Sequence, residues 1–588
     1  MFIPATLDEV KNLGWARLDI ILVTGDTYID SPHTGIAVIG KLLIKAGYKV
    51  GIIAQPDVAT DSDIKRLGEP LLFWGVTSGC VDSMVANYTA TKKRRKQDDF
   101  TPGGVNNKRP DRAVIAYSNL IRRFFKSTKP IVLGGIEASL RRVPHYDYWD
   151  DKIRRSILFD AKADLLVYGM GEKAVLEIAE KLKNNESTDP LRHSVSEASN
   201  VRGICYISNS AKDGYDLLPS YEEVKTNKQK FIEMFRTFYS NNDPLTASGL
   251  CQKQDTRYLI QNPPQNNMSP QELDEIYNMD FERDVHPYYK KQGQVRALET
   301  IRFSITTHRG CYGECNFCAI SVHQGTTVIS RTEKSILDEA AKITGLPDFK
   351  GYISDVGGPS ANMYGTGCGE KINQGHCKNK RCVYPKICEN LNFSHKKQLE
   401  LLVKLRALPG VKKVFVSSGV RHDLVLEDKK YGHAYLKELV LHHISGQLKI
   451  APEHTEEVVL KRMGKTAQNY LKDFKKLFDD LNKQHGKNQF LTYYFIAAHP
   501  GCGIDEMKKL KQFAIKELKV IPEQLQIFTP TPSTYSTLMY YTGQDPALCE
   551  NVFVEKEINK KAAQKEIILF SKNKKKAQMA TRLSLRTK

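Results

Sequence analysis

The sequence predicts an α/β protein built in two parts, an N-terminal doubly wound, mainly parallel sheet followed by a partial (β/α)6 barrel. Two observations support this fold class. Before residue 180, short apolar runs alternate with segments whose apolar residues fall at helical spacing. Between residues 301 and 528, six further strand candidates recur with helical segments between them. Because alternation of strands and helices is typical of parallel sheets, both parts are expected to be α/β structures.

The N-terminal domain, residues 1–180, is expected to contain about five strands of a doubly wound sheet. Residues 18–23 are apolar and end at Thr24-Gly25, as a buried strand would. Ile36, Ile39 and Leu43 follow at helical spacing. The remaining strand candidates are residues 48–54, 71–76, 131–133 and 164–168.

Residues 181–296 are predicted to be a connecting region, because Asn, Ser, Asp, Lys and Pro are frequent there and only residues 221–239 suggest helix. The barrel is assigned to residues 297–545 and a basic C-terminal extension to residues 546–588. In a barrel of this kind, chemistry is expected at the C-terminal ends of the strands. The barrel strand candidates are residues 301–305, 351–355, 413–417, 447–451, 490–497 and 524–528.

Composition limits the class of protein. No apolar run of the 588 residues approaches the roughly 18 needed to span a bilayer, and the first residues do not resemble a signal peptide. We therefore expect a cytoplasmic protein with no membrane partner. The net charge of +20 includes a basic run at residues 92–96 and a basic stretch at residues 550–588. These runs indicate either RNA as a further partner or solvated faces and tails.

The cysteines are unevenly distributed. Of 12 in the chain, seven lie between Cys311 and Cys388. Disulfides are disfavoured in reducing compartments, so clustered thiols there indicate metal or redox chemistry.

Cys311, Cys315 and Cys318 are spaced C-x3-C-x2-C directly after the first predicted barrel strand. Three thiolates can hold three irons of a [4Fe–4S] cluster and leave the fourth iron open, whereas an electron-transfer cluster takes four protein ligands. An open position is what lets a cofactor or substrate bind the metal. The alternative is a structural zinc site with His308 or His323 as the fourth ligand.

This loop resembles the signature C-x3-C-x-aromatic-C of the radical S-adenosylmethionine (SAM) superfamily, with Phe317 in the aromatic place. The resemblance implies that SAM binds the open iron and that one electron from the cluster cleaves it to a 5′-deoxyadenosyl radical. It also implies an electron donor such as flavodoxin or ferredoxin. Further residues are similar in order to the SAM-binding elements of the superfamily and are expected to contact this cofactor: Gly357, Gly358, Ser417, Arg421 and Glu453.

A closer resemblance rests on longer strings: 2–4 (FIP), 30–35 (DSPHTG), 134–139 (GGIEAS), 354–359 (SDVGGP) and 450–457 (IAPEHTEE). These are similar to the YgiQ family of radical SAM proteins. The resemblance implies a cobalamin-binding-like N-terminal domain, a radical SAM barrel and a C-terminal extension, and it implies no substrate. Because residues 30–35 read D-x-x-H-x-G and not the D-x-H-x-x-G of a base-off cobalamin site, we do not expect cobalamin to bind.

A second group of cysteines follows the glycine turn in a loop at residues 365–390. Cys368, Cys377, Cys382 and Cys388 could fully coordinate zinc or an auxiliary iron–sulfur cluster, or remain reduced and unligated. For the whole chain, the leading hypothesis is a radical SAM enzyme of unknown substrate. The alternatives are a non-catalytic iron–sulfur module for sensing or electron transfer and a zinc-stabilised RNA-binding or scaffold protein.

Overall fold

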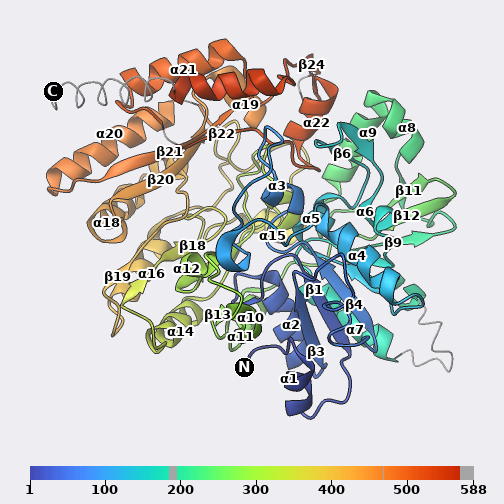
Figure 1. The fold of residues 1–588 in the computed structure, drawn as a ribbon. Coiled ribbons are helices and arrows are strands. Elements are labelled where there is room, and N and C mark those ends of the chain that lie inside the picture. The colour runs from blue at the N-terminus through green and yellow to red at the C-terminus, as the bar shows by residue number, and fades with distance from the viewer. Residues whose placement is uncertain (185–194, 468, 523, 548, 570–588) are drawn as a thin grey trace, which may run out of the picture.

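The computed structural model describes residues 1–184, 195–467, 469–522, 524–547 and 549–569 of a mixed α/β protein (Figure 1). A large sheet runs in the order β10-β11-β12-β9-β8-β5-β4-β1-β3. Its neighbours from β8 to β3 pair in parallel. These parallel strands are β1 (Ile20–Thr24), β3 (Val50–Ala54), β4 (Phe73–Thr77), β5 (Ile131–Leu133) and β8 (Leu165–Val167).

All five predicted strands of the N-terminal domain are therefore present. Every residue of β1 and β3 is buried, which explains why these strands are continuous apolar runs and do not alternate with polar residues. Strand β1 lies between β3 and β4, so the chain turns one way to form β3 and the other way to form β4, β5 and β8. In parallel sheets of this order, ligands bind where the direction reverses, beyond the carboxyl ends of the strands.

The segment expected to be a connecting region contributes strands to this same sheet. β9 (Ile204–Ser208) pairs antiparallel with β8, and β12 (Arg257–Gln261) and β11 (Leu250–Gln254) follow it. β10 (Asp216–Leu217) forms the edge. The single helix expected at residues 221–239 of this segment is present as two helices, α8 (Tyr221–Thr226) and α9 (Lys228–Ser240). The polar composition concealed these strands, because Gln252 and Gln254 are buried and hydrogen-bonded to each other at 3.0 Å.

The C-terminal half has strands at all six predicted positions, and among the described residues their parallel pairings form three small sheets and not one continuous barrel. β14 pairs with β18, β17 with β19, and β20 with β21 and β21 with β22. These strands are β14 (Ser304–Thr306), β17 (Tyr352–Ile353), β18 (Asp355–Gly357), β19 (Lys413–Val414), β20 (Gln447–Glu453), β21 (Phe490–Ala497) and β22 (Gln524–Ile527).

Amphipathic helices cover the strands of the C-terminal half. They include α14 (Glu333–Thr344), α16 (Lys396–Arg406), α20 (Asn469–Gln484) and α21 (Ile504–Lys516). In α20, Leu471, Phe474, Phe478 and Leu481 are buried at spacings of three and four residues, so one face of the helix packs on the core while its lysines face solvent.

Part of the basic C-terminal extension packs on the rest of the molecule. Residues 558–569 are helical, and within them Lys561, Gln564 and Ile568 are buried. The last basic residues, 570–588, lie outside the described part of the chain. Across the described ranges, no helix combines the length and apolar character needed to cross a bilayer.

Candidate active site

The three-cysteine loop leaves the carboxyl end of β14, passes through β15 (His308–Arg309) and ends at α13 (Ile320–His323). A tight turn brings the Cys318 amide to the Cys315 carbonyl at 3.0 Å. The loop is fixed to the opposite side of the C-terminal half, because the Asn316 amide donates to the Met463 carbonyl at 2.9 Å. The structure therefore holds the predicted cluster ligands on an ordered loop where parallel α/β proteins place their chemistry.

The three thiols lie close enough to influence one another's ionisation. Burial and the nearby Cys315 thiol raise the pKa of Cys311. Burial, together with Cys315, Cys311 and Glu453, raises the pKa of Cys318 to about 12. Thiols in such surroundings gain from a cation, because a metal stabilises the thiolate that burial alone disfavours.

Arg421, one of the predicted SAM-binding residues, is buried next to these thiols. Its Nε donates to Asp423 Oδ1 at 3.0 Å, and a second nitrogen pairs with the other oxygen of the same carboxylate. Burial opposes the charge, but Asp423 and the thiols of Cys315 and Cys311 outweigh it and raise the pKa of Arg421. The guanidinium is thus a fixed positive charge at the cysteine loop.

Glu453 reaches the same place from the end of β20. It has φ +70°, a backbone conformation that residues other than glycine rarely adopt, and the pairing of β20 with β21 shifts register between Ile450 and Glu453. Burial raises the pKa of the Glu453 carboxyl, while Lys465 and Arg421 oppose that increase. The irregular backbone therefore brings a carboxyl toward two cations and the Cys318 thiol.

Asp355 organises the serines that follow β19. Its carboxylate accepts hydrogen bonds from the amides of Ser417 at 2.7 Å and Ser418 at 3.1 Å, and it also pairs with the Ser418 hydroxyl. The Ser417 hydroxyl donates to the Ser354 carbonyl at 2.8 Å. The predicted SAM contact at Ser417 is therefore a fixed backbone turn, whose side chain is already engaged.

The predicted glycine turn ends β18. Gly358 packs against the ring of His308, so closely that a Cβ at this position would clash with the ring. A Cβ at Gly357 would lie 3.5 Å from the Cβ of Ser418, which is an ordinary van der Waals contact. Phe317, the aromatic residue of the signature, contacts the His499 ring edge-to-face with ring centroids 6.3 Å apart. The structure thus brings Cys311, Cys315, Cys318, Arg421 and Glu453 together and places Gly357, Gly358 and Ser417 on the neighbouring strand ends.

A cavity of about 590 Å³ separates the large sheet from the C-terminal half. The loops after β1, β4, β5 and β8 form one wall, and β14, β18 and α13 form the other. Several glycines in these loops let backbone approach the cavity: Gly79, Gly134, Gly135, Gly169, Gly171 and Gly358. The volume lies in the range of small-molecule and cofactor sites, and the position matches the reversal of strand order at β1.

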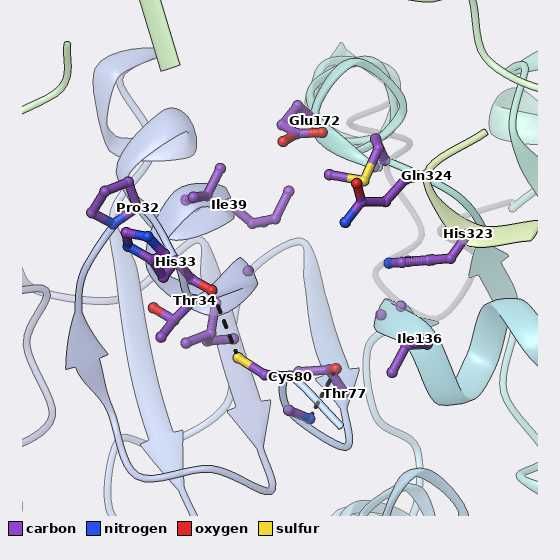
Figure 2. A pocket seen from close by; sticks show the side chains of 18 of the residues that line it. Pro32, His33, Thr34, Ile39, Thr77, Cys80, Ile136, Glu172, His323 and Gln324 are labelled. Carbon is purple, nitrogen blue, oxygen red and sulfur yellow. Dashed lines mark hydrogen bonds between the residues drawn. The ribbon is translucent and has the colours of Figure 1, made fainter. Parts of the chain in front are cut away.

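Side chains from both halves meet across this cavity (Figure 2). His33 approaches Thr306 with 3.3 Å between Nε2 and Oγ1, and His323 approaches Ser139 with 3.0 Å between Nδ1 and Oγ. Arg309 forms an ion pair with Glu172. These three pairs fix the two walls relative to each other.

Two polar atoms that line the cavity lack a partner within the described residues. They are Oε2 of Glu172, which is 3% exposed, and Nε2 of His308, which is fully buried. Burial lowers the pKa of His308 to about 4, so the imidazole is neutral near pH 7. Because unpaired buried polar atoms are costly, these two atoms favour a bound ligand with hydrogen-bonding groups.

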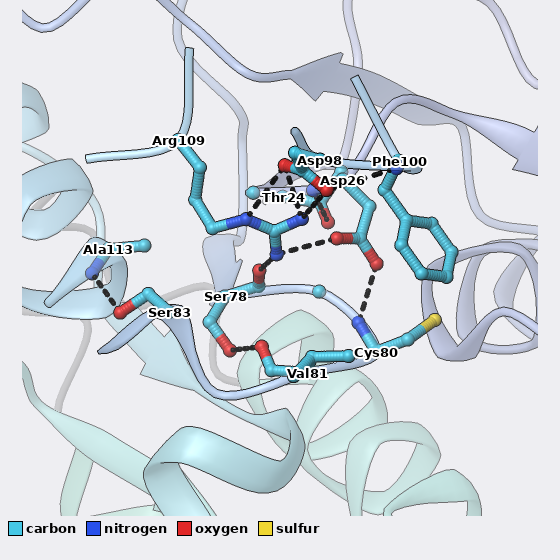
Figure 3. Close-up of polar contacts among 12 residues, drawn as sticks. Thr24, Asp26, Ser78, Cys80, Val81, Ser83, Asp98, Phe100, Arg109 and Ala113 are labelled. Carbon is cyan, nitrogen blue, oxygen red and sulfur yellow. Dashed lines mark hydrogen bonds and ion pairs between the residues drawn. The ribbon is translucent and has the colours of Figure 1, made fainter. Parts of the chain in front are cut away.

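A buried ion network supports the loop after β4 (Figure 3). Arg109 lies between Asp26 at 2.7 Å and Asp98 at 3.0 Å, and it donates to the Ser78 carbonyl at 2.9 Å. Asp26 in turn accepts the Cys80 amide at 2.6 Å. The network positions Cys80, whose thiol lines the cavity and whose pKa is raised well above its usual value by burial and by Asp26.

The sequence hypotheses did not include Glu172, His33 as a bridge between the halves, or the Arg109 network. Their positions in the sequence could have identified three of these residues. Asp26, Cys80 and Glu172 follow shortly after predicted strands, at the edge where parallel sheets bind ligands. Their pairing with the C-terminal half depends on how the two parts pack, which strand patterns do not specify.

The second group of cysteines, Cys368, Cys377, Cys382 and Cys388, lines one small separate pocket. His308 and His323, considered as fourth ligands to zinc, instead line the large cavity. Among the residues that the structure describes, no three His, Cys, Asp or Glu side chains converge as ligands of a single metal ion.

Comparison with known proteins agrees with this architecture. The family described as Radical SAM N-terminal matches residues 2–304. A UPF0313 protein of Fusobacterium nucleatum is 59% identical over 568 residues, which cover 96% of this chain and 98% of that protein. A UPF0313 protein of Thermotoga petrophila is 51% identical over 572 residues, covering 97% and 99%.

The chain belongs to the UPF0313 (YgiQ) family of radical SAM proteins. The resemblance read from the sequence is thereby confirmed. Both of these relatives match nearly the full length of the chain.

The solved structures that are similar to this chain include those of two radical SAM enzymes. TsrM from Kitasatospora setae, with cobalamin and a [4Fe–4S] cluster bound, is 14% identical, with a TM-score of 0.48, covering 87% of this chain and 76% of its own. OxsB, with aqua-cobalamin and SAM bound, is also 14% identical, with a TM-score of 0.48, covering 95% and 62%. The expectation that this UPF0313 chain does not take cobalamin is contradicted by these neighbours with bound cobalamin, and it is withdrawn.

The residues of the cavity fit such a group in part. The glycine-rich loops and the unpaired atoms of Glu172 and His308 suit a flat ligand with a polar rim. His33, by contrast, has both ring nitrogens near hydroxyl groups, Ser31 at 3.3 Å and Thr306 at 3.3 Å. It is therefore held between the two halves and is not a free ligand for cobalt.

Proposed function

We propose that this protein is a radical SAM enzyme whose catalytic [4Fe–4S] cluster is ligated by Cys311, Cys315 and Cys318. The observation that carries the proposal is the grouping of three partly buried thiols with the guanidinium of Arg421 and the carboxyl of Glu453. When bound, the reduced cluster would supply the electron that splits SAM into methionine and a 5′-deoxyadenosyl radical.

The chain's own residues have distinct roles in this proposal. The three thiolates would hold three irons of the cluster, and Arg421 stabilises the thiolate forms by its fixed charge. Gly357 and Gly358 leave room for the methionine part of SAM, next to the turn that Asp355 orders at Ser417. Glu453 and Lys465 supply a carboxyl and an ammonium for the polar groups of the cofactor.

One arrangement favours this function over a zinc-stabilised scaffold. The histidines considered as a fourth zinc ligand line the large cavity, where His323 contacts Ser139 and His308 lies beside Gly358. A mononuclear site would need sulfur atoms about 3.8 Å apart around one ion, whereas in a cubane each thiolate binds its own iron. The free thiols of the described cysteines also suit the reducing cytoplasm.

The cavity between the two halves has the size of a site for a second cofactor or for the substrate. We assign it to a corrinoid held without a histidine ligand, because glycine-rich loops form its wall and His33 is engaged. Incubation with hydroxocobalamin followed by gel filtration should leave a corrin absorption spectrum with the protein. Glu172→Gln should weaken that retention, whereas Glu180→Gln, in the same helix α7 (Glu172–Asn184), should not. A protein that retains no corrinoid would assign the cavity to substrate.

The electron donor is expected to be an acidic carrier such as flavodoxin or ferredoxin. Residues 93–96 of the basic run are exposed, so they present positive charge to such a partner. RNA is the competing partner for the same surface.

The function is tested by anaerobic reconstitution with iron and sulfide, reduction with dithionite, and measurement of 5′-deoxyadenosine from SAM. Wild-type protein should form it, and Cys311→Ala, Cys315→Ala and Cys318→Ala should each abolish it. Cys549→Ala, at an exposed cysteine far along the chain, is the matched control. Wild-type protein with a full cluster but no 5′-deoxyadenosine would overturn the proposal.

A further inference from the structure

The four cysteines of the loop at residues 365–390 converge on one pocket, separate from the large cavity. Cys368 immediately precedes α15 (Gly369–Gln374), and Cys377 lies just beyond it. Cys382 and Cys388 close a short turn, in which the Cys388 amide donates to the Cys382 carbonyl at 2.9 Å. The fold thus collects thiols that the sequence disperses along a loop.

The charge in this pocket is unbalanced. Lys371, on α15, lines the pocket and is only 5% exposed. Its Nζ contacts the Thr326 carbonyl at 3.0 Å and the Cys382 sulfur at 3.9 Å, and no carboxylate of the described residues lies within ion-pair distance of it. Glu370, which also lines the pocket, instead accepts the Asn390 amide at 2.9 Å. A buried ammonium without a carboxylate calls for another anion.

We propose that these four cysteines ligate a second iron–sulfur cluster, a [4Fe–4S] centre with every iron held by the protein. Four thiolates and a cubane core carry a net negative charge, which is the counter-ion that Lys371 lacks. All four thiols line this one pocket, so the loop supplies one thiolate for each iron of a cubane.

The second centre would lie directly against the catalytic loop. Arg381, which lines its pocket, donates to Asn316 Oδ1 at 2.7 Å and to the Glu314 carbonyl at 3.2 Å. Tyr312 and Thr366 join the two loops through hydroxyl groups 2.9 Å apart. Residues 312, 314 and 316 all lie between the catalytic cysteines, so ordering of one loop by a cluster also orders the other.

The test separates this site from the catalytic one. The Cys311→Ala/Cys315→Ala/Cys318→Ala variant, purified and reconstituted without oxygen, should retain about four irons and four sulfides per chain. Further replacement of Cys382 and Cys388 by Ala should remove them. Lys371→Met should reduce the retained iron at least twofold, whereas Lys378→Met, at an exposed lysine of the same loop, should not.

The result is independent of whether SAM is cleaved. A triple variant with native circular dichroism and no metal would overturn the second site, and stoichiometric zinc without sulfide would overturn its assignment as a cluster. Should the triple variant fail to fold, iron and sulfide analysis of protein that keeps Cys311, Cys315 and Cys318 decides: about eight irons per chain, falling to about four in Cys382→Ala/Cys388→Ala, support the site. About four irons in both proteins would overturn it.

Discussion

The ring of His308 occupies the space beside Gly358: a Cβ added at Gly358 would lie 2.5 Å from Cε1 of that ring. Gly358→Ala should therefore displace His308 toward the proposed SAM site and weaken SAM binding by about tenfold or more, equivalent to about 1.4 kcal/mol. Equilibrium dialysis of SAM against reconstituted protein measures the change. Gly345→Ala, where the nearest atom would be at 3.5 Å, is the control. Unchanged affinity in Gly358→Ala would mean that the turn does not face SAM.

Asp355 gives a second prediction for the cofactor site. Asp355→Ala removes the acceptor of the Ser417 and Ser418 amides, so the turn after β19 loses its fixed conformation. We expect a higher KM for SAM with the cluster absorbance retained. Ser418→Ala, which keeps both amide contacts to Asp355, should change KM much less. Equal effects of the two substitutions would show that the turn does not depend on the carboxylate.

We expect replacement of Arg109 to lower the stability of the fold, because this residue pairs with buried carboxylates and does not take part in the proposed reaction. Arg109→Met leaves Asp26 and Asp98 buried without their cation, and loss of one partner from a buried ion pair costs about 3 to 5 kcal/mol. The midpoint of urea unfolding should fall accordingly. Arg17→Met, at an exposed position, is the control and should leave the midpoint nearly unchanged. A midpoint equal to wild type would show that the two carboxyls are neutral.

The cavity histidines predict sensitivity to acid. Burial lowers the pKa of His308 to about 4, of His323 to about 4 and of His33 to about 3. As the pH falls, the unfolded chain takes up protons on these rings near pH 6.5, whereas the folded protein takes them up only near pH 4 or below. The free energy of unfolding should therefore fall as pH decreases from about 6.5 to 4. His308 alone would contribute up to roughly 3 kcal/mol. Urea unfolding at several pH values measures this, and His308→Gln should reduce the slope.

The exposed basic run gives a prediction about partners. Replacing Lys93, Arg94, Arg95 and Lys96 by Ser should slow reduction of the cluster by flavodoxin at low salt, because fewer charges attract the carrier. Stopped-flow absorbance measures the rate, with dithionite reduction as the control that should not change. Loss of RNA retention in a filter-binding assay, with the flavodoxin rate unaltered, would assign the surface to RNA instead.

Much of the fold could be predicted because its signals are local. The apolar runs of β1 and β3 are buried on both faces, and the cysteine spacing is confined to one loop. Strands β11 and β12 could not be predicted, because their buried glutamines are satisfied by partners far away in the sequence, such as Arg142 on Gln261 at 3.1 Å. Strand patterns likewise say nothing about how two sheets face each other, so the cavity and its unpaired atoms emerge only from the packing.

The pairs His33–Thr306, Glu172–Arg309 and Ser139–His323 also constrain how this fold can diverge. Each pair joins the part of the chain that contains the large sheet to the segment that carries Cys311, Cys315 and Cys318. Consider a hybrid protein that takes residues 1–303 from one relative and the remainder from another. The two walls of its cavity would keep their relative position only where the residues of each pair, one from each relative, still form the contact. Substitutions at the two members of each pair should therefore covary among relatives.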